Sequence, residues 1–126
     1  MKWLIDKILQ VVDTKVKIKV LVHEGFFIEK NRELYYFVKI TNLSPQNIFT
    51  ITHVWVKDKS KEIEIINPAR PLPHKLSSSD TWETWFSKDI IEDKNNVFKK
   101  VRVVLSNGKT YKSEKNIDVR PAGFVA

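Results

Sequence analysis

Apolar and polar residues alternate along most of this chain, in runs separated by turn-forming residues. In the first run, Val16 to Val22, every second residue is valine or isoleucine, and lysines stand at positions 17 and 19. A period of two is typical of a strand with one buried face. Comparable runs cover Leu34–Thr41, Ile48–Lys57, Glu62–Ile66, Thr81–Phe86 and Val97–Leu105. The pattern predicts an all-β protein, with an irregular stretch over His23–Glu33.

The number and spacing of these runs predict an immunoglobulin-like antiparallel β-sandwich of about seven strands. Three prolines within Asn67–Leu76 cannot donate the hydrogen bonds of a central strand. We therefore expect this segment to form an extended crossover between two sheets. Because alternation does not determine strand order, a small barrel is the alternative architecture.

A hairpin is expected at the end of the domain, where Asn107 and Gly108 separate Val97–Leu105 from Thr110–Lys112. An Asn-Gly pair favours a two-residue type I′ turn, in which both residues have positive φ. Such a turn would place Arg102 opposite Ser113.

Before the first strand the period changes from two to that of a helix. Residues 1–14 are predicted to form a short amphipathic helix, and residues 15–126 the β-sandwich domain with its C-terminal tail. The apolar face of the helix is the first candidate contact surface, and it consists of Ile5, Ile8, Leu9 and Val12. A helix this short is unstable alone in water. We expect it to pack on its own sheet, with a homodimer contact second and a membrane surface third.

Composition adds limits on function. The chain has 126 residues, 42% of them hydrophobic and 29% charged, as expected for one folded domain. It contains no cysteine, which excludes disulfides and thiolate metal sites. No apolar run has the length of a signal-peptide core or a transmembrane segment, so we expect a cytoplasmic protein. The net charge of +7 favours loose association with nucleic acid or another polyanion.

Several stretches resemble a group of short bacterial proteins to which no activity is assigned. The resemblance covers most of the chain from residue 15 onward. It is carried by Tyr35–Asn42, Thr52–Trp55, Asn67–Pro73, Asp80–Trp85, Lys112–Asn116 and Pro121–Val125. The strand that ends in Thr41-Asn42 is also similar to bacterial immunoglobulin-like modules. The resemblance implies the fold. It does not indicate any catalytic residue, cofactor or partner.

No catalytic or metal motif is present in the sequence. His23, His53 and His74 do not have the spacing of metal ligands, and we interpret them as structural. The serines at positions 77–79 lack the Gly-x-Ser-x-Gly frame of a nucleophile and are explained by a turn. We therefore expect no enzyme activity and no cofactor.

Aromatic residues form the second candidate contact surface, made of Tyr35, Phe37, Trp55, Trp82 and Trp85. Trp82 and Trp85 are three residues apart, so in one regular strand they face opposite sides. We expect the outward rings to be covered by the helix, by Phe26 and Phe27, or by the C-terminal tail, because large open apolar patches are uncommon. The functional alternative is a surface that binds a partner protein or a sugar.

Basic residues of the last hairpin form the third candidate surface, a stripe made of Lys100, Arg102, Lys112 and Lys115. We favour the interpretation that these lysines prevent an exposed strand edge from pairing with other molecules. The sequence therefore predicts a noncatalytic protein-binding or accessory module. The alternatives are an electrostatic binder of nucleic acid or another polyanion, and an enzyme whose site is assembled from loops.

Overall fold

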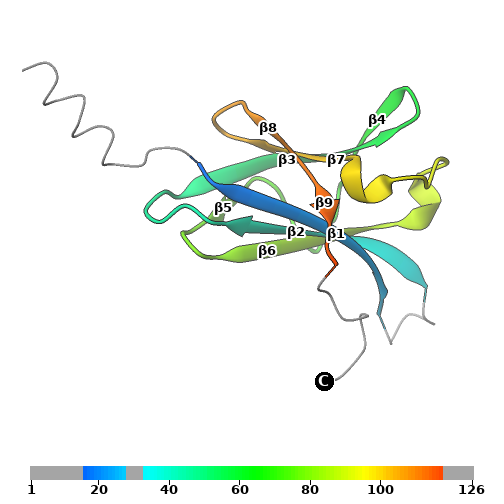
Figure 1. Cartoon of the computed structure of the whole chain (residues 1–126), viewed down its shortest axis with the longest axis horizontal. Helices are drawn as coiled ribbons and strands as arrows, with labels where there is room; N and C mark the ends of the chain where they lie inside the picture. Colours follow the sequence, from blue (N-terminus) through cyan, green and yellow to red (C-terminus); the bar gives the residue numbers. More distant parts are fainter. Residues whose placement is uncertain (1–15, 28–32, 118–126) are drawn as a thin grey trace, which may run out of the picture.

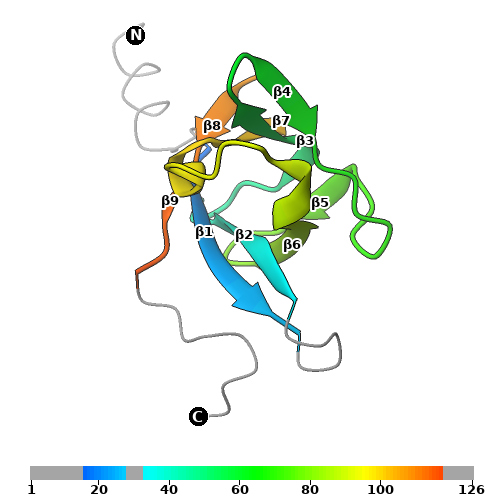
Figure 2. The same ribbon diagram turned by 90° about the vertical axis from the view of Figure 1, so that its right-hand side faces the viewer.

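The computed structural model describes residues 16–27 and 33–117, which form two β-sheets packed face to face (Figures 1 and 2). Sheet A has the strand order β6-β2-β1-β9, and sheet B has the order β4-β3-β7-β8 with β5 beside β3. The strands are β1 (Ile18–Phe26), β2 (Leu34–Asn42), β3 (Phe49–Asp58), β4 (Lys61–Glu64), β5 (His74–Leu76), β6 (Thr81–Ser87), β7 (Val101–Leu105), β8 (Thr110–Lys112) and β9 (Glu114–Lys115). The 3₁₀ turns η2 (Lys88–Ile90) and η3 (Val97–Lys99) lie between β6 and β7. The expected all-β class is confirmed, whereas the predicted helix and the last part of the tail lie outside the described residues.

One core fills the space between the sheets. It takes Val22 and Val38 from sheet A and Val54 and Val103 from sheet B, all of them fully buried. These residues are the inward members of the alternating runs, which explains why the period of two identified the strands. Asn42 is also fully buried at the end of β2, where its side chain bonds three backbone groups.

β1 is longer than the sequence indicated. The expected irregular stretch begins at His23, but the strand continues to Phe26, which pairs with Leu34 of β2. Backbone pairing holds this segment in the sheet without any apolar period. Residues 23–26 of the stretch were therefore predicted wrongly from their side chains.

A β-bulge in β3 changes which side chains enter the core. The pairing of β3 with β7 shifts between Ile51 and His53, and the Thr52 hydroxyl donates to the Val104 carbonyl at 3.0 Å. An unbroken alternation predicts one face for Phe49, Ile51 and Trp55. The extra residue of the bulge instead buries Ile51 and Val54 and turns Trp55 outward, half-buried.

The last hairpin closes through a three-residue turn. Of Asn107 and Gly108, Gly108 alone has positive φ, at 82°, and the Gly108 N–H donates to the Leu105 carbonyl at 2.9 Å. This is a β-turn followed by a left-handed glycine, not the type I′ turn. The register consequently moves by one residue, and Arg102 pairs with Lys112 instead of Ser113. β7 begins at Val101, after η3, and not at Val97.

The proline-containing segment does not cross between the sheets. Residues 65–73, which we call the proline strap, connect β4 to β5, and both of these strands pair with the same edge of β3. The crossover is residues 77–80, where the chain passes from β5 in sheet B to β6 in sheet A. Proline excludes the strap from the ladder, as expected, but the chain returns to the same sheet after it.

Candidate binding surface

The outer face of sheet A carries an aromatic cluster separate from the core. Direct pairing across three strands places His23, Phe37 and Trp85 in one row. The Phe27 ring lies over this row, with its centroid 5.2 Å from the centroids of both Phe37 and Trp85, and 5.6 Å from that of Tyr35. We call His23, Phe27, Tyr35, Phe37 and Trp85 the outer aromatic cluster. Phe37 is only 4% exposed although it points away from the core.

Burial makes His23 an unusual member of the outer aromatic cluster. Its ring stacks on Phe37 with a centroid distance of 5.2 Å, and the buried Nδ1 atom has no hydrogen-bond partner in the described part of the chain. Burial lowers the pKa of His23, and the nearby charge of Lys39 lowers this pKa further. A neutral imidazole can pack among rings, whereas a charged one would lose its hydration.

The next row of sheet A is charged. Lys39 pairs directly with Glu83 across β2 and β6. Burial raises the pKa of the Glu83 carboxyl, while the positive charges of Lys39 and Arg70 oppose that rise. The outer face therefore joins an apolar region to a polar one within a single pair of strands.

The proline strap is fixed to the edge strand β6 by two side chains. Arg70 Nε donates to the Glu83 carbonyl at 3.0 Å, and its guanidinium lies 5.2 Å from the Trp85 ring centroid. Asn67 Nδ2 donates to the Thr84 hydroxyl at 3.3 Å and, over a longer 3.5 Å, to the Trp85 carbonyl. These contacts occupy backbone acceptors of an edge that would otherwise be open to another strand.

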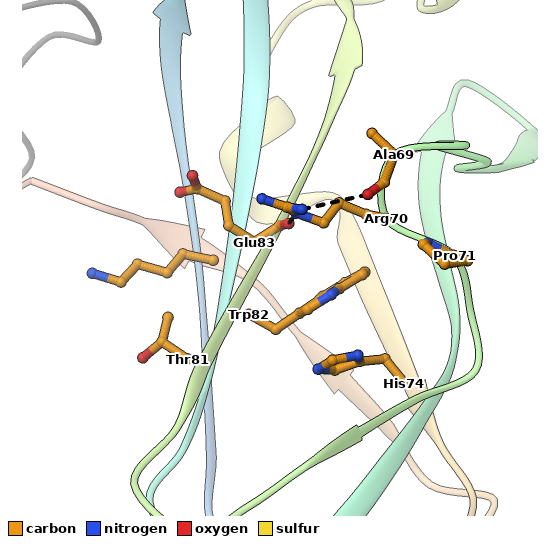
Figure 3. A pocket seen from close by; sticks show the side chains of 8 residues that line it. Ala69, Arg70, Pro71, His74, Thr81, Trp82 and Glu83 are labelled. Carbon is orange, nitrogen blue, oxygen red and sulfur yellow. Dashed lines mark hydrogen bonds between the residues drawn. The ribbon is translucent and has the colours of Figure 1, made fainter.

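Among the described residues, clefts lie on several sides of the strap. The first, of about 580 Å³, separates the strap from the start of β6 (Figure 3). His74 stacks on Trp82 at its lower end in that view, with ring centroids 5.3 Å apart, and Arg70 and Glu83 lie at the other end. The second, of about 670 Å³, lies between the strap and Thr52 and His53 of β3, in the part of the β3 edge between β4 and β5. The third, of about 340 Å³, lies between the end of β6 and β4. All three have the size of sites for small molecules or short peptide segments.

On the outer face of sheet B a second tryptophan stands among basic residues. Trp55 pairs directly with Arg102, which pairs in turn with Lys112. The ring of His53 stacks on Trp55 with a centroid distance of 5.9 Å. The sequence does not interleave these aromatic and basic residues, so only the sheet brings them together.

The structure therefore divides the predicted aromatic surface. Tyr35, Phe37 and Trp85 do lie together, and Phe27 covers them as the sequence suggested. Trp82 points into the core and is 7% exposed, because the odd spacing from Trp85 gives it the opposite face. Trp55 belongs to the other sheet, so placing these two tryptophans on the same surface was wrong. Arg70, whose role depends on the path of the strap, had no signal in the sequence.

The predicted basic stripe is also incorrect as a single surface. Arg102 and Lys112 are neighbours, but Lys115 lies in β9 of sheet A, with its ammonium over the Phe98 ring at 5.1 Å. Lys100 Nζ forms an ion pair with Asp93 at 3.2 Å. The short β8 and the passage of the chain to sheet A after Lys112 separate residues that are close in sequence.

The third predicted surface, the helix contact of Ile5, Ile8, Leu9 and Val12, lies outside the described residues. Within residues 16–27 and 33–117, no three histidine, aspartate or glutamate side chains come together as metal ligands. No helix in this part of the chain is long and apolar enough to span a bilayer. Comparison of the chain with models of protein families, with curated proteins and with solved structures found no match.

Proposed function

We propose that this protein is a noncatalytic binding module built on an immunoglobulin-like sandwich. The strand order supports the fold proposal: β1, β2 and β6 are neighbours in one sheet, and β3, β7 and β8 are neighbours in the other. These positions correspond to strands A, B, E and C, F, G of immunoglobulin domains. Membership of the group of short bacterial proteins and a cytoplasmic location stay predictions.

The observation that carries the binding proposal is the outer aromatic cluster beside the strap clefts. Aromatic rings on an exposed sheet face, next to charged side chains and concave surface, are typical of protein interaction sites. Tyr35 and Trp85 are half-buried and belong to both the outer aromatic cluster and the third cleft. A partner can therefore contact the rings and enter a cleft at the same time.

Affinity capture from cells of the source organism, followed by cross-linking, tests this proposal. The bait variants are Tyr35→Ser and, as a matched control on an exposed turn, Leu43→Ser, whose residue is 53% exposed. We expect a specific partner to be retained by the wild type and by Leu43→Ser and lost by Tyr35→Ser at an unchanged melting temperature. Equal retention by all three baits would contradict the proposal.

A specific observation also supports the alternative of polyanion binding. Trp55 next to Arg102 and Lys112 combines a ring on which a base can stack with cations that can bind phosphate. Binding of a single-stranded oligonucleotide should then weaken steeply with salt, and the Arg102→Gln/Lys112→Gln variant should flatten this dependence. No binding at low salt would exclude the alternative.

The predicted helix of residues 1–14 stays a proposal, with packing on its own sheet first and a contact between two copies of the chain second. The support for either contact is the apolar spacing of Ile5, Ile8, Leu9 and Val12. If the helix joins two copies, deleting residues 1–12 should convert a dimer into a monomer in light scattering. If the deletion variant has the same oligomeric state as the full chain, the contact between two copies is wrong.

A further inference from the structure

The third cleft is an apolar groove at the open side of the sandwich, and we call it the edge groove. Ile63, Ile66, Phe86 and Ile90 contribute to its lining. Ile66 is 79% exposed and Ile90 is 40% exposed. Two large aliphatic side chains that are exposed beside one concave surface indicate a binding site for a group outside the described residues.

The edge groove lies between two edge strands. β6 ends sheet A and β4 ends sheet B within the described residues, and the lining includes Glu64 of β4 and Ser87 of β6. Arg70 and Asn67 of the strap bond the carbonyls of Glu83 and Trp85 on the β6 edge. Neither of these two side chains bonds the last residue of β6, Ser87. An edge strand beside an apolar groove is a template for an added strand, whose alternate side chains enter the groove.

The rim of the edge groove is acidic although the chain as a whole carries a net charge of +7. Glu64 lines the groove, and Glu33 accepts a hydrogen bond from the Tyr35 hydroxyl at 3.2 Å. Burial raises the pKa of the Tyr35 phenol, and the nearby negative charges of Glu33 and Asp89 raise it further. The nearby Lys88 does not neutralise this rim, because its ammonium pairs with Glu24 at 2.8 Å.

None of the three acidic rim residues takes part in an ion pair within residues 16–27 and 33–117, where the pairs are Lys59–Glu92, Lys88–Glu24 and Lys100–Asp93. On the other side of the strap, the first cleft is lined by two cations, Lys39 and Arg70, and by the carboxylate of Glu83. The cations outnumber the carboxylate there, whereas the rim of the edge groove is acidic. A cationic ligand is therefore favoured at the edge groove over the first cleft.

We propose that the edge groove binds an extended segment of a partner protein in which apolar side chains alternate with lysine or arginine. The apolar side chains would contact Ile66 and Ile90, and the cations would face Glu33, Glu64 and Asp89. This inference rests on the proposed binding function and specifies the chemistry of the partner. Charge complementarity selects the basic segment over an acidic one.

Fluorescence anisotropy of a labelled peptide tests the inference on the full-length protein. The probe is an acetylated hexapeptide of the sequence Lys-Val-Lys-Ile-Lys-Val, and the control probe has glutamate in place of each lysine. We expect saturable binding of the basic probe alone. Two pairs of matched variants locate it: Ile66→Ser against Ile48→Ser, and Glu64→Lys against Glu114→Lys.

Ile48 is 60% exposed in a loop at the other end of β3, and Glu114 is an exposed strand residue in sheet A. We expect Ile66→Ser and Glu64→Lys to raise the Kd by roughly five- to tenfold and the two control variants to change it less than twofold. Equal effects of groove and control variants, equal binding of both probes, or no binding of the basic probe would each overturn the inference. Phe27 belongs to the outer aromatic cluster and does not line the edge groove. If capture of a partner is lost in Phe27→Ser in that case, the binding function stands and only the edge groove is wrong.

Discussion

Replacing each of the two tryptophans of β6 by alanine should separate the core from the outer aromatic cluster. Trp82 is 7% exposed, belongs to the core and stacks on His74. Deleting its ring removes buried apolar surface and leaves a cavity, which costs about 3 to 5 kcal/mol of unfolding free energy. Trp85 is half-buried and contacts Phe27 and Arg70 instead. Its loss should cost about 1 to 2 kcal/mol, because aromatic and cation–π contacts on an open face are weaker.

Urea denaturation followed by far-UV circular dichroism measures both variants without depending on tryptophan fluorescence. We expect Trp82→Ala to lower the midpoint far more than Trp85→Ala, at an unchanged m-value. In thermal unfolding the corresponding decrease in Tm should be roughly 10 to 20 °C for Trp82→Ala and 3 to 8 °C for Trp85→Ala. Equal large losses would show that both faces of sheet A are fully buried, and would refute the placement of Trp85 on a binding surface.

Three further predictions concern buried polar groups. Asn42→Ala should lower the unfolding free energy by about 2 to 4 kcal/mol in urea melts, since it removes the partners of three backbone groups; a loss no larger than that of an exposed residue would contradict this. Backbone N–H donors of Glu92 and Asp93 lower the pKa of Asp58 below 3.8. The contribution of the Asp58 carboxylate to the free energy of unfolding is therefore present above pH 3.8 and is lost as the pH falls through the lowered pKa. Asp58→Asn should therefore flatten the acid limb of stability against pH, and an unchanged limb would show that the cap is unimportant. The lowered pKa of His23 makes protonation oppose folding, so stability should be full above pH 6.5 and decrease as the pH falls below it; His23→Phe should remove this decrease in pH-dependent thermal melts.

The sequence determined the class of the fold and the faces of its regular strands. In β2 the alternation places Tyr35 and Phe37 on the face opposite to Tyr36 and Val38, and the structure buries Tyr36 and Val38 in the core. The odd spacing of the tryptophans in β6 gave them opposite faces in the same way. These predictions held because a period of two is a property of the local backbone.

The tertiary structure decided whatever depends on a change of register or on distant neighbours. One extra residue at the bulge of β3 put Ile51 and Trp55 on opposite faces, and one extra residue in the last turn moved Arg102 opposite Lys112. Each is a change of one residue in the local backbone that reverses or shifts every strand pairing after it. The alternation of apolar and polar residues in the sequence does not reveal such a change.

The candidate site depended even more on distant contacts. Arg70 and Asn67 meet β6 only because the strap returns to the edge of β3 and runs beside sheet A. The edge groove likewise combines β4, the strap and β6, segments that come together only when the two sheets pack. The sequence alone therefore identified most of the strands and the side chains that share a face in the regular ones, whereas the packing of the sheets created the clefts and determined which charges surround them.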